Sequence, residues 1–187
     1  MAVVDSYFSD IHDSGNDAQA ILIINGAGPT KIVNNYLEAS GENVMFGGAD
    51  PWIGTNIDAS HPAAAQDNAG NSGLVPSDIE LRGNHFSKPL TWKADDPSYA
   101  GNDWVIKNLL EFKSAQRVLV AGNVFEQSWV DAQDGTAIVI KSANSNNAPW
   151  SVSRDITIVN NIIRHSSAGI RVTGQGAVLP GDGRTSN

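Results

Sequence analysis

The sequence contains no cysteine, no cluster of basic residues and no long apolar run. Without cysteine there are no disulfides, no thiolate metal sites and no cysteine nucleophile. The net charge of −8, with 20 acidic and 12 basic residues, disfavours binding to nucleic acid and to anionic membranes. The longest apolar run, residues 20–24, is far shorter than the roughly 20 residues of a membrane-spanning helix.

The start of the chain, "MAVVDSYF", lacks the basic and apolar regions of a signal peptide. Hydrophobic residues make up 41% and charged residues 17% of the 187 residues, a composition typical of a folded domain. We therefore expect a single domain over residues 1–187.

A repeated pattern occupies most of the chain. Its anchor is an asparagine after an alternating apolar segment, as in "KIVNNYL", "IELRGNHF", "VLVAGNVF" and "ITIVNNII", and a weaker copy, "VVDSYF", has Ser6 in the asparagine place. A second alternating segment follows each anchor, as in "AILIING", "NVMFGG", "LLEFKS", "AIVIKS" and "GIRVTG". Apolar spacing of two and the abundance of Val and Ile indicate strands, and prolines fall outside these segments.

Short strands repeated in this way predict a single-stranded, right-handed parallel β-helix of about five coils. Equivalent residues should then stack between coils. Apolar rows are expected at Phe8, Leu37, Phe86, Phe125 and Ile163, and at Val44/Phe46, Leu110/Phe112, Ile138/Ile140 and Ile170/Val172. Asn35, Asn84, Asn123 and Asn161 should form a ladder at a corner that tolerates left-handed backbone angles. Long insertions are expected at about 49–77, 87–103 and 143–153.

The segments "IVNNYLEASGENVMFGG" and "ITIVNNIIRHSSAGIRVTG" resemble right-handed parallel β-helix repeats of the pectate-lyase-like superfamily. The chain also resembles repeat regions of large uncharacterised bacterial proteins. The superfamily includes polysaccharide lyases, glycoside hydrolases, epimerases, phage tailspikes and non-catalytic surface proteins. This resemblance implies a segment of a longer secreted or cell-surface bacterial protein, with polysaccharide as its partner. Both ends of the chain read as uncapped coils, which favours self-association there.

Enzymes that resemble this chain act on an outer sheet face, so outward positions are the candidates for catalysis. In the second strands Met45, Glu111, Val139 and Arg171 form one outward row, and Lys113 and Lys141 belong to the next. Glu111, Lys113, Lys141 and Arg171 are the catalytic candidates, with Arg171 as a clamp for a sugar carboxylate and Lys141 or Arg171 as a base. The alternative is a solvated face with ordinary charge interleaving.

Other sets of polar residues match known catalytic or metal-binding motifs only in part. Polygalacturonase-like enzymes carry an "NTD … DD … GHG … RIK" set, of which the chain has only faint traces around Asp131 and Asp134, and no "GHG". The groups Asp95, Asp96 and Asp103, or Asp131 and Asp134, offer oxygen ligands for Ca²⁺, without an EF-hand spacing. No pair of histidines has the spacing of a metal site.

The tryptophans lie in or beside the insertions, where an aromatic ring can stack on a sugar or hold the insertion against the coil. The candidates for substrate binding are Trp52, Trp92, Trp129, Trp150 and His165. Three functions remain open: a non-catalytic carbohydrate-interacting scaffold, a polysaccharide lyase or glycoside hydrolase, and a structural spacer.

Overall fold

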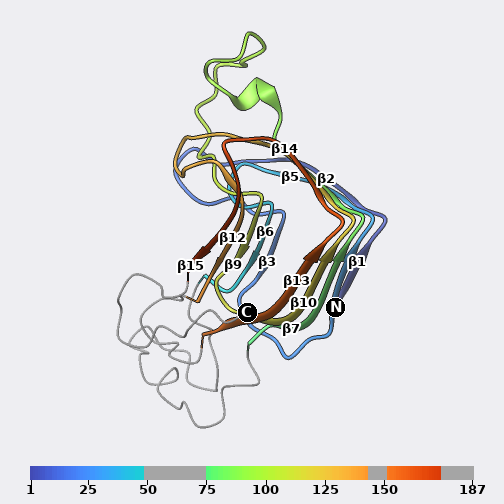
Figure 1. The fold of residues 1–187 in the computed structure, drawn as a ribbon. Coiled ribbons are helices and arrows are strands. Elements are labelled where there is room, and N and C mark those ends of the chain that lie inside the picture. The colour runs from blue at the N-terminus through green and yellow to red at the C-terminus, as the bar shows by residue number, and fades with distance from the viewer. Residues whose placement is uncertain (49–74, 143–150, 174–187) are drawn as a thin grey trace, which may run out of the picture.

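A computed structural model describes residues 1–48, 75–142 and 151–173. It is an all-β structure with three parallel sheets of five strands each, and the chain visits sheets A, B and C in turn on every pass (Figure 1). This arrangement is compatible with a β-helix solenoid. Among the described residues, no helix is long and apolar enough to cross a membrane.

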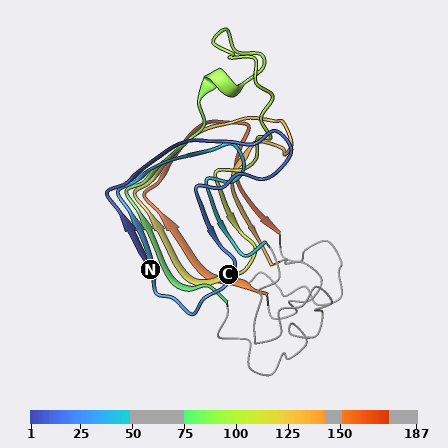
Figure 2. The same ribbon diagram turned by 180° about the vertical axis from the view of Figure 1, so that it is seen from behind.

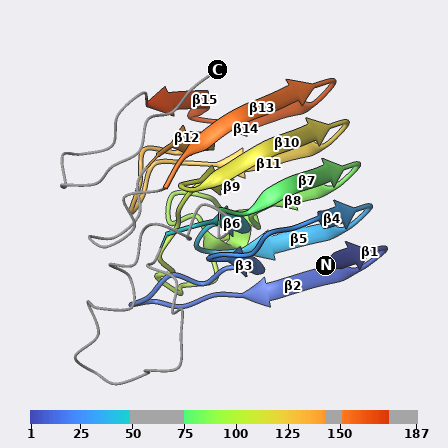
Figure 3. The same cartoon turned by 90° about the horizontal axis from the view of Figure 1, so that it is seen from below.

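Each sheet takes one strand from every pass of the chain, and Figure 3 shows the passes stacked one above another. Sheet A contains β1 (Ala2–Val4), β4 (Thr30–Val33), β7 (Ser77–Arg82), β10 (Ala115–Ala121) and β13 (Ser153–Val159). Sheet B contains β2 (Tyr7–Ile11), β5 (Tyr36–Ala39), β8 (His85–Ser87), β11 (Val124–Ser128) and β14 (Ile162–Ser166). Sheet C contains β3 (Ile21–Ile23), β6 (Val44–Phe46), β9 (Leu110–Phe112), β12 (Thr136–Lys141) and β15 (Ala168–Thr173).

The predicted apolar rows are confirmed by the strand register. Phe125 pairs with Phe86 on one side and with Ile163 on the other, and Leu37 pairs with Phe86 and Phe8. The Phe86 and Phe125 rings stack with centroids 4.4 Å apart. In sheet C, Phe112 lies between Phe46 and Ile140 in the same way. These side chains fill the interior, where stacked aromatic rings contribute about 0.5–1.5 kcal/mol beyond the area they bury.

The asparagine ladder is also confirmed. Asn35 donates its backbone N–H to Oδ1 of Asn84 at 3.0 Å, Asn84 donates to Asn123 at 2.9 Å, and Asn123 donates to Asn161 at 2.8 Å. Ser6, in the asparagine place, donates its N–H to Asn35 Oδ1 at 2.9 Å. Because each of these donors would otherwise be a buried unpaired group, the ladder stabilises the corner between sheets A and B.

The left-handed residue at this corner is one position earlier than the sequence pattern predicts. The positive φ angles belong to the residue before each ladder position, namely Asp5 (52°), Asn34 (56°), Gly83 (63°), Gly122 (66°) and Asn160 (56°). Asp, Asn and Gly are the residues that adopt this conformation at low cost, so the five corners share one two-residue geometry. The ladder asparagine itself is free to place its amide between passes.

The segment from residue 88 to residue 109 leaves the body after β8 and returns at β9; the part drawn in green projects from one side in Figures 1 and 2. It contains the short 3₁₀ helix η3 (Leu90–Trp92). We call this segment the β8–β9 insertion. It corresponds to the insertion predicted at about 87–103, whereas most of the other two predicted insertions lies outside the described residues.

Lys88 fixes the start of this insertion. Its side chain is 0% exposed, and its Nζ lies within hydrogen-bond distance of three carbonyls and one amide oxygen: Ala39 at 2.6 Å, Ser40 at 3.0 Å, Gly41 at 2.5 Å and Asn43 Oδ1 at 3.0 Å. A buried ammonium group is tolerated only with such partners. Lys88 therefore ties the insertion to the turn between β5 and β6.

Candidate functional site

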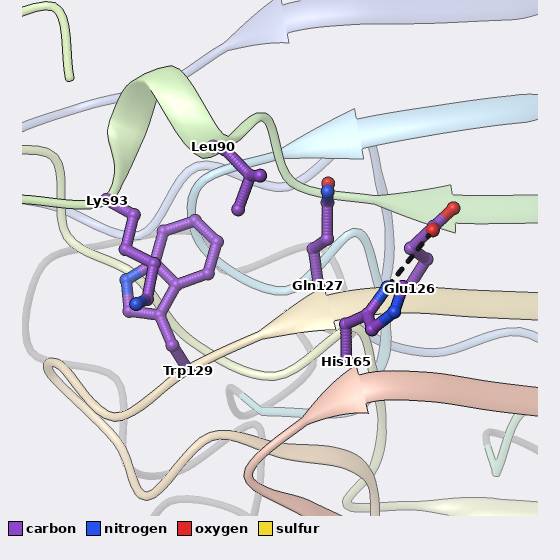
Figure 4. A pocket seen from close by; sticks show the side chains of 6 residues that line it. All are labelled: Leu90, Lys93, Glu126, Gln127, Trp129 and His165. Carbon is purple, nitrogen blue, oxygen red and sulfur yellow. Dashed lines mark ion pairs between the residues drawn. The ribbon is translucent and has the colours of Figure 1, made fainter. Parts of the chain in front are cut away.

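Two adjoining pockets lie between the β8–β9 insertion and the outer side of sheet B. One, of about 370 Å³, is lined by Leu90, Lys93, Glu126, Gln127, Trp129 and His165 (Figure 4). The other, of about 380 Å³, is lined by Lys93, Ala94, Asp95, Trp129, Val130, Asp131 and Ser167. Because Lys93 and Trp129 line both, the two pockets form one continuous candidate site, which we call the Trp129 site.

Trp129 is held in place by the loop that follows β11. Gly135, with φ of 73°, closes this loop, and a Cβ at its position would lie 2.6 Å from the carbonyl carbon of Trp129. Asp131 Oδ1 accepts the N–H of Ile106 at 3.2 Å, which joins the loop to the returning part of the insertion. Two elements far apart in sequence thus position the half-buried indole at the surface.

Glu126 organises the polar side of the site. Its carboxylate forms an ion pair with Arg164, whose Nε lies 2.9 Å away. The same carboxylate lies 3.0 Å from His85 Nε2 and 3.4 Å from His165 Nδ1. The hydrogen bond from Arg164 lowers the pKa of Glu126; burial opposes this, and the bond from His85 adds to the lowering. Glu126 is therefore a carboxylate at neutral pH, able to accept hydrogen bonds from hydroxyl groups.

Local backbone geometry directs two of the lining side chains. Gln127 and His165 have φ of 65° and 53°, and neither takes part in the strand pairing between β11 and β14. Because pairing resumes at Ser128 and Ser166 without a change of register, the two left-handed residues lie opposite each other and form a shared kink that re-aims their side chains. As a result, Gln127 and His165 line the pocket beside Glu126 (Figure 4).

The sequence-predicted sugar-binding residues separate into three groups. Trp129 and His165 come together in the Trp129 site. Trp92 is buried at 8% exposure and packs edge-on against His12, with ring centroids 5.7 Å apart, so it supports the insertion. Trp52 and Trp150 lie outside the described residues. Trp104, also in the insertion, stacks on the His12 ring with centroids 3.8 Å apart.

The sequence-predicted catalytic residues lie on sheet C, away from the Trp129 site. Glu111 is in register with Met45 and Val139, and Arg171 pairs with Val139, as expected. The expectation of a solvated row is wrong for three of these positions, because Met45 is 5% exposed and Glu111 and Val139 are 0% exposed. Pointing away from the coil interior does not by itself place a side chain in water.

Ion pairs engage these charged groups. Lys141 Nζ lies 2.8 Å from Glu111 Oε1, and Arg171 pairs with Asp134. Burial pushes the pKa of Glu111 up, but Lys113 and Lys141 outweigh it and hold the pKa below its ordinary value. Glu111 is thus a buried carboxylate with a cationic partner.

The carboxylates considered for Ca²⁺ have partners of their own. Asp95 pairs with Lys93 at 2.6 Å, Asp96 accepts from Ser98 at 2.6 Å, and Asp134 accepts from Thr136 at 2.8 Å. In the described parts of the chain, no three His, Cys, Asp or Glu side chains come together as a metal site. Asp95, Asp96 and Asp134 are thus engaged by neighbouring side chains.

No sequence pattern marks Leu90, Lys93, Gln127 or Glu126 as lining residues of this site. The insertion that brings Leu90 and Lys93 to the pocket has no periodic pattern. An outward glutamate and the left-handed residue after it read as ordinary surface. Comparison with family models, with curated proteins and with solved structures finds no match to this chain.

Proposed function

We propose that this chain is a carbohydrate-interacting β-helix scaffold, non-catalytic in itself, and that it binds sugars at the Trp129 site. The right-handed winding in about five coils, the likeness to the pectate-lyase-like superfamily, and a place in a secreted or surface bacterial protein belong to the same proposal. The single observation that carries the binding role is Trp129, a half-buried indole shared by two adjoining pockets.

The chemistry of the lining supports a sugar ligand. An indole face stacks on the C–H face of a pyranose ring. Around Trp129, Gln127 and Glu126 offer amide and carboxylate groups on one side, and Asp131 offers a carboxylate on the other. Pockets of about 370 and 380 Å³ fall in the range of small-ligand sites. Their adjacency suits neighbouring units of one oligosaccharide.

The charge pattern supports binding without catalysis. Glycoside hydrolysis needs two carboxyl groups facing the scissile bond, about 5–10 Å apart. Glu126 is already shared among Arg164, His85 and His165, and Glu111 lies buried on another sheet. Carboxylates that are paired or buried in this way form a fixed polar surface for binding.

A glycan array followed by calorimetry with the best ligand tests the proposal. Trp129→Ala should weaken binding about tenfold, which corresponds to the roughly 1.4 kcal/mol of a lost stacking contact. Tyr7→Ala removes another aromatic ring, 72% exposed and three strands away from β11 in the same sheet, and should leave binding unchanged. A protein that binds no glycan, or a Trp129→Ala variant that binds as tightly as the unaltered chain, would refute the site.

A further inference from the structure

The outermost strands of the three sheets define two ends of the molecule. The first end consists of β1, β2 and β3, and the last end consists of β13, β14 and β15 (Figure 3). Within the described residues, each of these strands pairs with a neighbour on one side only. A strand edge of this kind presents backbone donors and acceptors that can pair with another strand.

Both ends expose apolar side chains that are covered elsewhere. In the inner passes of sheet C, Leu110, Phe112 and Ile138 are 0% exposed. At the last end the corresponding row members Ile170 and Val172 are 47% and 55% exposed. At the first end Val3, Phe8 and Ile23 are only partly buried, although they pack against the core. At each end, the last members of the interior apolar rows therefore form an exposed apolar surface.

The two ends carry opposite charge. The charged side chains of residues 1–30 are all acidic: Asp5, Asp10, Asp13 and Asp17. At the last end, Arg154, Arg164 and Arg171 outnumber Asp155. The Arg164 and Arg171 side chains are 53% and 44% exposed and that of Asp10 is 82% exposed, so these groups reach the surface at the two ends even though Arg164 pairs with Glu126, Arg171 with Asp134 and Asp10 with His12. Opposite ends attract and like ends repel.

We propose that the last end of one copy binds the first end of a second copy, so that sheets A, B and C continue from one molecule into the next. The existing register fixes the contacts. Continuing each row by one step places Ile158 on Val3, Ile163 on Phe8 and Val172 on Ile23 of the second copy.

The polar rows continue in the same register. Asn161 occupies the row of Ser6, so its N–H meets the Ser6 Oγ where an inner corner has an asparagine Oδ1. Arg164 lies one residue beyond Ile163, and Asp10 lies in the bulge of β2 after Phe8. Arg164 therefore meets Asp10 across the junction. The apolar rows and the corner row therefore find matching partners, whereas Arg171 continues onto Leu22 of the second copy.

The geometry of the contact sets the kind of assembly. A contact between two different surfaces, repeated along one axis, does not close on itself and gives an open-ended row of molecules. This inference does not depend on sugar binding, although His165 of the outermost strand β14 lines the Trp129 site.

Sedimentation velocity of the full chain over a thousandfold concentration range tests the proposal. The weight-average mass should rise steadily past twice the monomer mass. Arg164→Glu and Asp10→Lys should each remain monomeric at concentrations where the unaltered chain associates. Lysine fits the backbone at position 10, where φ is 60°, because Arg117 adopts φ of 52°. Mixing the two variants should restore association, since every junction in the mixture again joins opposite charges.

Matched controls separate the junction from general effects. Arg117→Glu reverses another exposed arginine, paired with Asp78 at 2.7 Å but located on an inner pass, and should associate like the unaltered chain. Val172→Asp should abolish association without touching the Glu126 cluster, whereas Val130→Asp, at a side-surface position that is 68% exposed, should not. A monomer at all concentrations, a dimer that saturates, or folded charge variants that fail to associate when mixed would overturn the proposal.

Discussion

Asn84 donates both its backbone N–H and its side-chain N–H to Oδ1 of Asn123, each at 2.9 Å. Asn123 in turn donates its side-chain N–H to the carbonyl of Leu81 at 3.0 Å. Its side-chain N–H also donates to Oδ1 of Asn161 at 2.9 Å, so one amide serves four groups, two of them on the preceding ladder residue. Along the ladder, each Oδ1 accepts from the asparagine of the pass before it, and each backbone N–H donates to the asparagine of the pass after it.

Asn123→Ala should therefore destabilise the protein strongly. It removes the acceptor of a buried N–H and the donor of a buried carbonyl, at a cost of about 1–3 kcal/mol for each unsatisfied group. We expect a loss of about 3 kcal/mol in the free energy of unfolding, measured by urea denaturation. Asn161→Ala, at the last and half-buried rung, should cost about 1 kcal/mol. Equal losses at the two positions would contradict the ladder's role in the core.

Lys88→Met should also destabilise the protein, by about 3 kcal/mol or more, because carbonyls of the turn between β5 and β6 lose their donor. The control is Lys31→Met on the exposed face of β4, which should change stability by less than about 0.5 kcal/mol. Hydrogen exchange should show faster exchange in the β8–β9 insertion of Lys88→Met. Stability within 1 kcal/mol of the unaltered chain would show that Lys88 does not anchor this segment.

The pair of the buried Glu111 and the partly exposed Lys141 gives a double-mutant prediction. Lys141→Met removes the cation that lies 2.8 Å from the Glu111 carboxylate while Lys113 stays nearby, so we expect a loss of about 1–3 kcal/mol. Adding Glu111→Gln should recover much of that loss, because the remaining amide carries no charge. Chemical denaturation of the two single variants and the double variant measures the coupling. Additive losses would mean that the two side chains do not act as a pair.

Glu126 should contribute to the acid dependence of stability. Its folded-state pKa is lowered below the ordinary value of 4.5, so the unfolded chain binds more protons in this range. The contribution is therefore fully present above about pH 4.5 and is lost as the pH falls through the folded-state pKa. Glu126→Gln should cost up to about 1 kcal/mol at pH 7 and nothing at low pH, as measured by urea denaturation along a pH series. A difference that stays constant with pH would contradict this.

The sequence was sufficient to predict the rows of the fold. Strict alternation around a recurring asparagine fixes which residues share a face, and a slip of one residue would turn Phe86 and Phe125 outward. The pattern could not locate the left-handed corner residue, because asparagine occupies both candidate positions at residues 34–35 and 160–161. There the choice depends on backbone geometry, which the pattern leaves open.

The candidate site was predicted only in part. Trp129 and His165 were identified from the sequence because an aromatic ring and an imidazole beside a corner are conspicuous. Lys88 and Lys93 were missed, because their roles depend on how an aperiodic insertion folds back onto the body. Glu111 was misjudged as solvated, since alternation shows which side of a strand a residue occupies but not what covers that side.

The corner between sheets A and B is two residues long on every pass, from Asp5-Ser6 to Asn160-Asn161. The other two connections in each pass vary in length, and the Trp129 site lies beside one of them. Changes in length that add new recognition loops can therefore accumulate at those connections without disturbing the ladder. The corner between sheets A and B thus keeps the passes in register, and the other connections can change in length and sequence.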